Sequence, residues 1–536
     1  MRSTLLTADR LRAFALAILC VASALALAAP ADAAPSRKPG TSKARRPAAG
    51  RHAAAHPPAP APSATLDPPT VPAFSLPIDK TTLPNGLRVV LQPDKSSSAI
   101  GVAVVFSAGP RHESKNQQGF SAAVARVLSE APATLAPDRV RELTLRGGSL
   151  STSSTPDLVA FVDLVPPGAL DFTLWLESRR AAVSSFPATV VEAMRSSQQG
   201  FDRLLPVPGQ LGPATPPLAR MAFEGFWPYE HDASAVDASA SPETLRDFHH
   251  AWFGAENAAV CVSGAIDPDA ARALVERHFG QLPRNPQPPA FNPAPLPDQT
   301  NQRSAVVRTE SPRPLMALGW AVPSARQPEH DALELAASIL GEGPESRLAQ
   351  RMSHARSPAS FAVEIDERRG PSLFTISLQA ADDAALLAAR KLVDEELDAL
   401  ARLGPSSDEM LRGWRSAQSG FLRGLQRPEE RALRLASLEL LHGDARLVHA
   451  ELARRMSAGK DDVRKAVARF LSPTRRSVVE ANAAGRSVET PPPAPVPAAA
   501  APRPAPAAAT LPRGKAPAHK KPPASAPKKP AKPKKR

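Results

Sequence analysis

Short apolar runs and amphipathic segments alternate along the central part of the chain. The segments LRVVLQP (residues 87–93) and AIGVAVVFSAG (99–109) are rich in β-branched residues and follow an Asn-Gly turn signal, so they predict strands. The segments DPDAARALVERHFGQL (267–282) and EHDALELAASILGEG (329–343) begin with acidic residues and space their apolar positions near the helical period. Strands and helices therefore mix, and the pattern predicts an α+β fold.

The same pattern occurs twice. Trp252 and Val260 in AWFGAENAAVCVSGA each match a residue 218 positions later in ARFLSPTRRSVVEAN, namely Phe470 and Val478. Upstream, SQQGF (197–201) matches AQSGF (417–421) at an offset of 220. Separate matches at nearly one offset indicate an internal duplication. We expect two homologous mixed α/β domains.

The first residues have the layout of an export signal. Arginines precede an apolar run over residues 13–29, and Ala31-Asp32-Ala33 fits a cleavage site. Cys20 follows a leucine rather than a small residue, which disfavours a lipoprotein anchor. After cleavage, Cys261 is the only cysteine, so no intrachain disulfide can form, and no later segment is long and apolar enough to predict a membrane helix. The sequence predicts an exported bacterial protein that is periplasmic, otherwise envelope-associated, or secreted.

Composition divides the rest of the chain. The net charge of +14 belongs to the two ends, because residues 36–65 and 500–536 are basic and contain no acid, whereas the body is slightly acidic. Both ends are rich in Ala and Pro and too poor in large apolar residues to fold. We predict six parts: a signal peptide (1–33), a disordered Pro/Ala/basic segment (34–74), an N-terminal domain (75–280), a Pro-rich linker (281–300), a C-terminal domain (301–485) and a disordered Ala/Pro/Lys-rich tail (486–536).

Several motifs follow one another in a distinctive order. They are TTLPNGLRVVLQPD (81–94), SAGPRHESKNQQGF (107–120) with Gly109, Arg111 and Glu113, LWLESRR (174–180), WPYEH (227–231), WFGAENAAV (252–260) and LGEGPESRL (340–348). With them the body, from about Thr81 to Ala484, resembles the insulinase/pitrilysin zinc peptidases, especially their mitochondrial processing-peptidase-like branch. The resemblance implies two peptidase-like domains.

The resemblance also implies where a catalytic metal would be held. The family carries H-x-x-E-H on the helix after a glycine that matches Gly119, with a further glutamate tens of residues on; histidines one turn apart can hold one Zn²⁺, and the glutamate can activate its water. Here the motif positions fall at Ala122, Ala125 and Arg126, and the distal position falls at Met194. None of the 12 histidines begins an H-x-x-E-H motif in another register. We therefore expect no standard metal site, no catalytic residue and no cofactor.

Substrate-holding positions of the family also differ. Some members work as pairs, in which one partner supplies an arginine and a tyrosine seven residues apart; those places fall at Ser353 and Ser360, and Tyr229 is the only tyrosine. Three arginines of the same segment (Arg347, Arg351 and Arg356) either bind an anion or lie solvated on the surface. The strand that the family uses as a substrate edge has Ser151 in place of its usual asparagine. Its backbone can still pair with extended peptides.

The leading hypothesis is a non-catalytic homologue of a zinc metalloendopeptidase that acts as a subunit or peptide-binding scaffold in the cell envelope. Its expected partners are an active relative or a second copy, and extended peptides. Two alternatives stay open. One is an active zinc-dependent endopeptidase with a non-standard metal site. The other is a protein that binds anionic envelope polymers through residues 500–536; nucleic acid is not expected, because export and the lack of interleaved aromatic residues oppose it.

Overall fold

The computed structural model describes most of the central part of the chain. The described residues are 69–70, 74–193, 214–231, 236–284, 295–309, 311–483 and 485. The predicted signal peptide and both predicted basic ends, including residues 500–536, lie outside them. Among the described helices, none combines the length and apolarity needed to cross a membrane.

The first half of the described chain forms a six-stranded sheet with the order β1-β2-β6-β3-β5-β4. β2 runs parallel to β6, and the other neighbours are antiparallel. The strands are β1 (Asp79–Thr82), β2 (Arg88–Pro93), β3 (Ile100–Phe106), β4 (Ser149–Ser154), β5 (Val159–Val165) and β6 (Ala258–Gly264). The helices of this part of the sequence are α2 (Phe120–Leu135), α3 (Pro137–Leu145), α4 (Leu170–Ala181), α6 (Thr215–Ala222), α7 (Trp227–Glu230), α8 (Pro242–Trp252) and α9 (Pro268–Phe279).

The second half repeats this plan. Its five-stranded sheet has the order β7-β11-β8-β10-β9, with β7 parallel to β11 and the other pairs antiparallel. The strands are β7 (Arg303–Arg308), β8 (Leu315–Val322), β9 (Ser360–Asp366), β10 (Ser372–Gln379) and β11 (Ser477–Asn482). The helices are α10 (Pro328–Gly341), α11 (Arg347–His354), α12 (Asp383–Leu403), α13 (Ser407–Gly424), α14 (Pro428–His442), α15 (Val448–Arg455) and α16 (Lys460–Phe470). β2, β6, β3, β5 and β4 thus correspond to β7, β11, β8, β10 and β9, which confirms the predicted α+β fold and its duplication.

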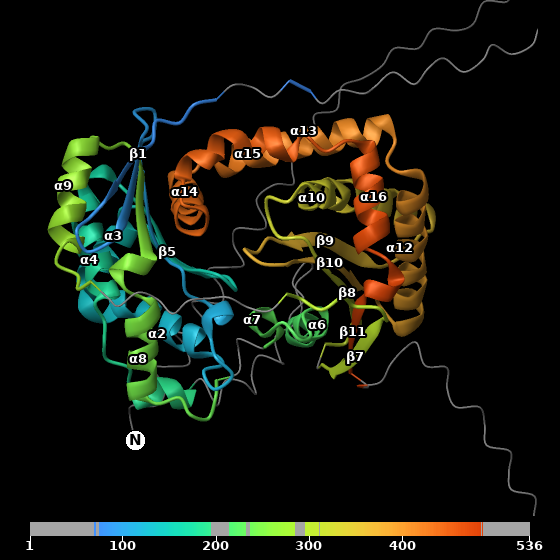
Figure 1. Ribbon diagram of the computed structural model, residues 1–536, viewed down its shortest axis with the longest axis horizontal. Coiled ribbons are helices and arrows are strands. Elements are labelled where there is room, and N and C mark those ends of the chain that lie inside the picture. The colour runs from blue at the N-terminus through green and yellow to red at the C-terminus, as the bar shows by residue number, and fades with distance from the viewer. Residues whose placement is uncertain are drawn as a thin grey trace, which may run out of the picture. The chain divides into compact units, whose positions relative to one another are not determined.

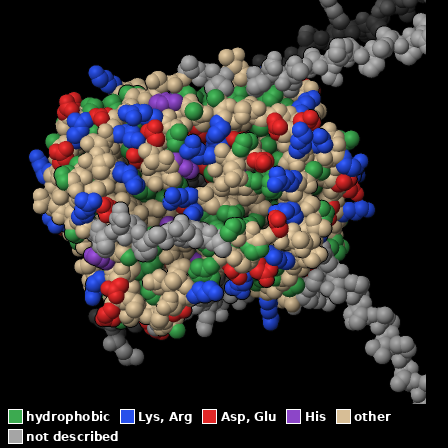
Figure 2. Space-filling model, in the orientation of Figure 1, with side chains coloured by type: hydrophobic (Ala, Val, Ile, Leu, Met, Phe, Trp, Pro, Cys, Tyr) green, Lys and Arg blue, Asp and Glu red, His purple; other side chains and the backbone are tan. Residues whose placement is uncertain are grey.

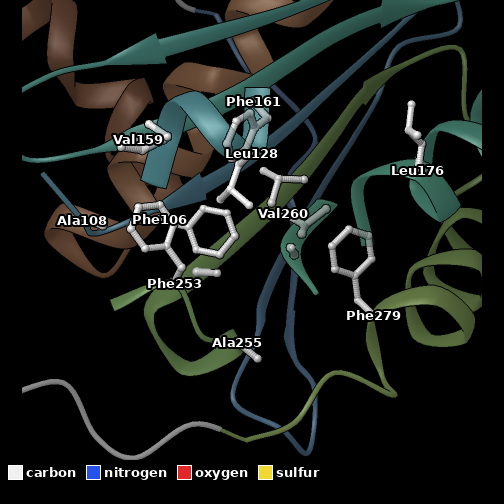
Figure 3. Close-up of a cluster of buried hydrophobic side chains, with 14 of the residues drawn as sticks. Phe106, Ala108, Leu128, Val159, Phe161, Leu176, Phe253, Ala255, Val260 and Phe279 are labelled. Atoms are coloured by element: carbon white, nitrogen blue, oxygen red, sulfur yellow. The ribbon is translucent and has the colours of Figure 1, made fainter. Parts of the chain in front are cut away.

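Each sheet is covered on one face by helices of its own half (Figure 1). In the first sheet, alternate side chains of the buried strand β3 point into the core that α2, α4, α8 and α9 close. Figure 3 shows part of this core, in which the Phe106 ring lies 6.3 Å from Phe161 and 5.3 Å from Phe253. In the second sheet, α10, α12 and α16 cover the corresponding face around Trp320 and Phe374. Burial on both faces explains why the central strands read as continuous apolar runs.

The opposite faces are covered by an exchange between the halves. α14, from the second half of the sequence, packs against β3 and β6, where Leu435 and Ala436 meet Val105 and Cys261. α6, from the first half, packs against β8 and β11. The contact of α14 is close, because a Cβ on Gly101 would lie 2.2 Å from the carbonyl carbon of Pro428. This exchange ties the two sheets into one packed unit.

Charged side chains are distributed evenly over the visible surface. Figure 2 shows basic and acidic side chains interspersed on one face rather than gathered by sign. Several exposed charged side chains of the described residues form ion pairs, such as Arg126 with Glu130 and Arg351 with Glu395. Among the described residues, the visible face therefore has no patch in which basic side chains gather alone.

Candidate functional site

The helix α2 begins at a buried glutamate. Gly119 ends the preceding turn with φ of 78°, a conformation that favours glycine, and Phe120 starts the helix. The Glu113 carboxylate accepts hydrogen bonds from the backbone N–H of Gly119 and of Ser121, both at 2.8 Å, and from Ser121 Oγ at 2.5 Å. Its negative charge at the N-terminus of the helix is favourable. Glu113 therefore fixes where α2 begins.

The side chains at the predicted metal positions lie along α2. Ala122 is half-buried, Ala125 is buried, and Arg126 is exposed and pairs with Glu130 at 3.3 Å. Methyl groups offer no lone pair, and a guanidinium is a cation without an acceptor atom, so these three side chains have no chemistry for holding Zn²⁺. Residues 188–193 are helical, whereas Met194 lies outside the described residues. The assignment of these positions to the family's ligands stays a prediction.

Residues of the quoted motifs have structural partners. Arg111 Nη1 donates to Asp157 Oδ1 (3.1 Å) and to Tyr229 Oη (3.1 Å), and Tyr229 Oη donates to Asp157 Oδ1 (2.7 Å). The turn between β9 and β10 joins this group, because Arg369 N donates to Asp157 Oδ2 (2.9 Å) and Gly370 N donates to Tyr229 Oη (2.9 Å). Burial raises the pKa of Tyr229, so its hydroxyl stays protonated. Tyr229 thus helps to hold the two halves together.

The motif WPYEH also supports the start of α2. Trp227 Nε1 donates to Glu113 O (2.7 Å), and His231 Nε2 lies within hydrogen-bond distance of Glu113 Oε2 (3.0 Å). The rings of Trp227 and His231 stack with centroids 4.3 Å apart. His231 is therefore a buried partner of Glu113.

The motif LWLESRR places two charged residues in the core. Glu177 and Arg180 of α4 are 0 % and 2 % exposed, and Arg180 Nη2 lies 3.0 Å from Glu177 Oε1. Asp163 of β5, also fully buried, adjoins them. Burial and the neighbouring Glu177 raise the pKa of Asp163 well above its ordinary value, while Arg180 opposes the shift. Burial also raises the pKa of Glu177, again against Arg180. The Arg180 guanidinium is therefore the cation that opposes the pKa shifts of both Asp163 and Glu177.

The predicted peptide-binding strand lies at the sheet edge. β4 is the last strand of its sheet, and Ser151 Oγ donates to Val162 O (2.8 Å), so this serine side chain is taken up within the sheet. Thr155 N donates to Leu158 O (2.8 Å). Hydrogen-bonded and non-hydrogen-bonded residue pairs alternate along an antiparallel ladder. Because Thr155 is hydrogen-bonded to Leu158, Thr152 lies in a non-hydrogen-bonded pair three residues earlier, and its N–H points away from β5. The outer edge of β4 can accept an extended peptide.

Two cavities adjoin the edge strands. One, of about 420 Å³, lies between the end of β4, the start of β5 and helices α13, α14 and α15. The other, of about 490 Å³, lies between β9, α10 and α13. They share Gly420, Phe421 and Arg455 in their linings. Both β4 and β9 thus border space that an extended chain could occupy.

The predicted substrate-pair positions lie apart from α2 in the sequence and the fold. Ser353 is exposed on α11, and Ser360 is the exposed first residue of β9. Of the nearby arginines, Arg347 forms a bidentate ion pair with Glu409 (2.7 and 2.9 Å). Neither serine offers the charge or the ring that the resemblance assigns to its position.

A second group of potential ligands was not predicted from the sequence. His330, Glu334 and Glu367 have donor atoms that all lie within 4.8 Å of one another, and they are the one such group of three that the described residues contain. His330 and Glu334 are four residues apart on α10, a spacing that could have drawn attention to them. Glu367 follows β9 and comes close only through the fold.

Comparisons with known proteins agree with the fold. Residues 239–415 match the domain family described as "Peptidase M16 inactive domain". An uncharacterized zinc protease of Mycobacterium tuberculosis is 26 % identical over 416 residues, which cover 75 % of this chain and 92 % of the relative. A protease from Helicobacter pylori has a similar crystal structure, with a TM-score of 0.67 and 18 % identity over 76 % of this chain and 100 % of that one. A chain of complex III2 from Candida albicans gives a TM-score of 0.63 at 14 % identity, covering 76 % and 96 %. The motif order, the duplicated fold and these matches together confirm that the chain resembles the insulinase/pitrilysin (M16) peptidase family.

Proposed function

We propose that this protein is a non-catalytic member of the family that binds extended peptides in the bacterial cell envelope. The observation that carries the proposal is the surface of α2, where Ala122, Ala125 and Arg126 provide no metal ligand and no general base. The residues that position this helix have kept their contacts, Glu113 above all. Loss of the chemistry together with retention of the fold favours a binding role.

The peptide would pair with the edge of β4. Outward N–H and C=O groups of that strand supply main-chain hydrogen bonds, which do not depend on the sequence of the peptide. The cavity of about 420 Å³ at the end of β4 would receive side chains, and its wall includes Phe421, Leu425 and Leu433. The adjoining cavity would extend the path toward β9.

A proline at position 152 tests this mode of binding. Thr152→Pro removes one outward N–H without removing a ladder hydrogen bond, and edge strands tolerate proline at such places. We expect the affinity for a fluorescently labelled unstructured peptide, measured by anisotropy, to fall about tenfold or more, the value of one or two main-chain hydrogen bonds. Thr152→Ala keeps the N–H and is expected to bind as the wild type does. Equal binding by the proline variant, with its fold intact, would rule out β4 as the site.

The same proposal includes partners. A pairing with a metal-bearing relative, or with a second copy of this chain, would let the protein supply one wall of a shared cavity. The likeness to a chain of complex III2 supports an assembled role, because that relative is part of a larger complex. Residues 500–536 would add contacts with anionic envelope polymers.

A further inference from the structure

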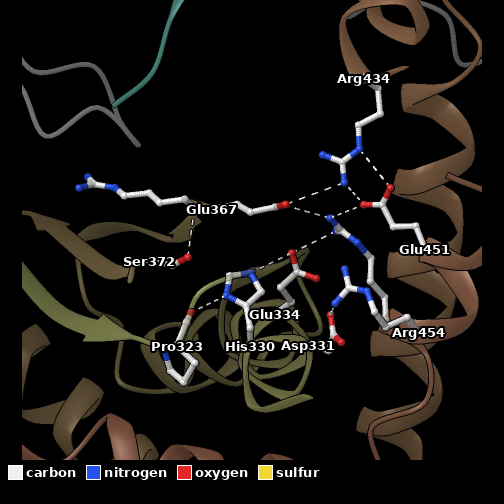
Figure 4. Close-up of polar contacts among 11 residues, drawn as sticks. Pro323, His330, Asp331, Glu334, Glu367, Ser372, Arg434, Glu451 and Arg454 are labelled. Atoms are coloured by element: carbon white, nitrogen blue, oxygen red, sulfur yellow. Dashed lines mark hydrogen bonds and ion pairs between the residues drawn. The ribbon is translucent and has the colours of Figure 1, made fainter. Parts of the chain in front are cut away.

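His330 is oriented as a metal-binding histidine would be. It is 1 % exposed, and its Nδ1 donates to Pro323 O at 3.0 Å, which leaves the lone pair on Nε2 (Figure 4). A hydrogen bond from the other ring nitrogen to a backbone carbonyl is the usual way in which a ligating imidazole is fixed. Nε2 is buried and has no hydrogen-bond partner among the described residues. A buried acceptor in that state is costly unless something else binds it.

Two carboxylates converge on the same nitrogen. Glu334 lies one turn further along α10, with Oε1 3.7 Å from His330 Nε2, which is beyond hydrogen-bond length. Glu367 reaches the same place from the turn after β9. A nitrogen lone pair and two carboxylates facing one another repel unless a cation lies between them. Imidazole and carboxylate together form a donor set that Zn²⁺ accepts.

Arg455 supplies positive charge to this group in the present structure. Its Nη1 lies 3.1 Å from Glu334 Oε1, and its Nη2 lies 3.2 Å from Glu367 Oε2. The same guanidinium lies 3.0 Å from Glu451 Oε1, a third carboxylate, on its own helix. Arg455 could therefore keep one ion pair after leaving the other two. It neutralises both glutamates, whereas His330 Nε2 makes no hydrogen bond among the described residues.

The group can be reached from solvent. Glu334 and Arg455 both line the cavity of about 490 Å³ beside β9, and the Arg455 side chain is 23 % exposed. A cation entering that cavity would meet Arg455 first and the buried His330 last. The donor atoms, now up to 4.8 Å apart, would draw together by about an ångström to match Zn–N and Zn–O bonds of about 2 Å.

We propose that His330, Glu334 and Glu367 form a binding site for a divalent transition metal such as Zn²⁺, with Arg455 as the internal cation that the metal displaces. The site lies in the second half of the chain and is separate from α2, so it does not depend on whether α2 lacks a metal. One imidazole and two carboxylates leave the remaining coordination positions to water.

A proton is the alternative occupant. Burial alone would lower the pKa of His330, but the adjacent Glu334 carboxylate and the charge of Glu367 outweigh it and raise the pKa. A ring protonated on both nitrogens would satisfy the carboxylates without a metal. The two cases differ in what Arg455 does, because only a metal competes with it for the position between the glutamates.

Zinc titration of the full chain after chelator treatment distinguishes them. We expect one Zn²⁺ per chain in equilibrium dialysis, with affinity reduced at least about tenfold in His330→Gln and in Glu367→Gln. Arg455→Gln should bind Zn²⁺ about tenfold more tightly, because the competing cation is gone. Arg454→Gln is the matched control, since Arg454 pairs with Asp331 instead, and it should change the affinity by no more than about twofold to threefold.

Each outcome has one meaning. The metal site would be overturned if the folded Arg455→Gln protein failed to bind Zn²⁺. It would also be overturned if His330→Gln and Glu367→Gln both bound Zn²⁺ with unchanged affinity. Zinc that remains bound in both His330→Gln and Glu367→Gln and that supports chelator-sensitive cleavage of an unstructured peptide would in addition count against the proposed non-catalytic function. The two variants at positions 330 and 367 come from different elements, so misfolding of one leaves the other as a test.

Discussion

Replacing Arg180 with methionine is expected to lower the free energy of unfolding by about 3–5 kcal/mol, as removal of one partner from a buried ion pair does. Methionine keeps much of the aliphatic stem that packs in the core, so the loss reports the charge. Two buried carboxyl groups, Asp163 and Glu177, would then lack their cation. The guanidinium also lies 4.4 Å from the Phe161 ring, a contact that adds a smaller amount.

The pH dependence identifies the cause of that loss. The raised pKa values of Asp163 and Glu177 mean that the folded state holds protons which the unfolded chain releases above about pH 4. The stability that these two groups contribute is therefore present at low pH. It falls as the pH rises from about 4 through their raised pKa values in the folded state. Without Arg180 the pKa values of Asp163 and Glu177 rise further. The loss of unfolding free energy in Arg180→Met, measured by chemical denaturation, should therefore be larger at pH 8 than at pH 5.

Arg179→Met is the matched control for this experiment. Arg179 is the preceding residue on α4 and is exposed, so its replacement should change the free energy of unfolding by no more than about 0.5 kcal/mol. A wild-type-like Arg180→Met protein at pH 8 would show that the buried carboxyl groups are stable without the guanidinium.

Replacing Glu113 with alanine is expected to lower the free energy of unfolding by about 3 kcal/mol. The change removes the acceptor of two backbone N–H groups at the start of α2 and of the Ser121 hydroxyl, and it leaves the buried His231 Nε2 without its partner. Thermal and urea unfolding would measure the loss.

Glu130→Ala provides the comparison within the same helix. Glu130 is exposed and forms an ion pair with the exposed Arg126 at 3.3 Å, so its loss should cost less than about 0.5 kcal/mol. If Glu113→Ala were as stable as Glu130→Ala, Glu113 would not be the residue that holds the start of α2. The comparison therefore shows whether Glu113 stabilises the start of α2 more than an exposed glutamate of the same helix does.

Local patterns in the sequence predicted the elements well. The strands around LRVVLQP and AIGVAVVFSAG and the helices around residues 267–282 and 329–343 lie where periodicity placed them, because each buries one face or both. Trp252 and Phe470, which match in the sequence repeat, are the last residues of the equivalent helices α8 and α16. Duplication was therefore readable from a few residues.

Features that depend on long-range contacts could not be predicted in the same way. The apolar faces of α6 and α14 indicate burial but not which sheet covers them, so the exchange between the halves appears only in the fold. Similarly, nothing local to Glu367 indicates that it meets His330. The assignment of the family's ligand positions to Ala122, Ala125 and Arg126 stays a prediction, and Met194 lies outside the described chain.

Cleavage of an unstructured peptide, measured together with the zinc content of the same full-length sample, tests the central claim most directly. We expect no turnover, and no bound zinc that depends on residues 122–126, whether or not zinc occupies His330, Glu334 and Glu367. The non-catalytic assignment would be contradicted by turnover that a chelator stops, if substitutions at Ala122 and Arg126 abolish both that turnover and the binding of one zinc per chain.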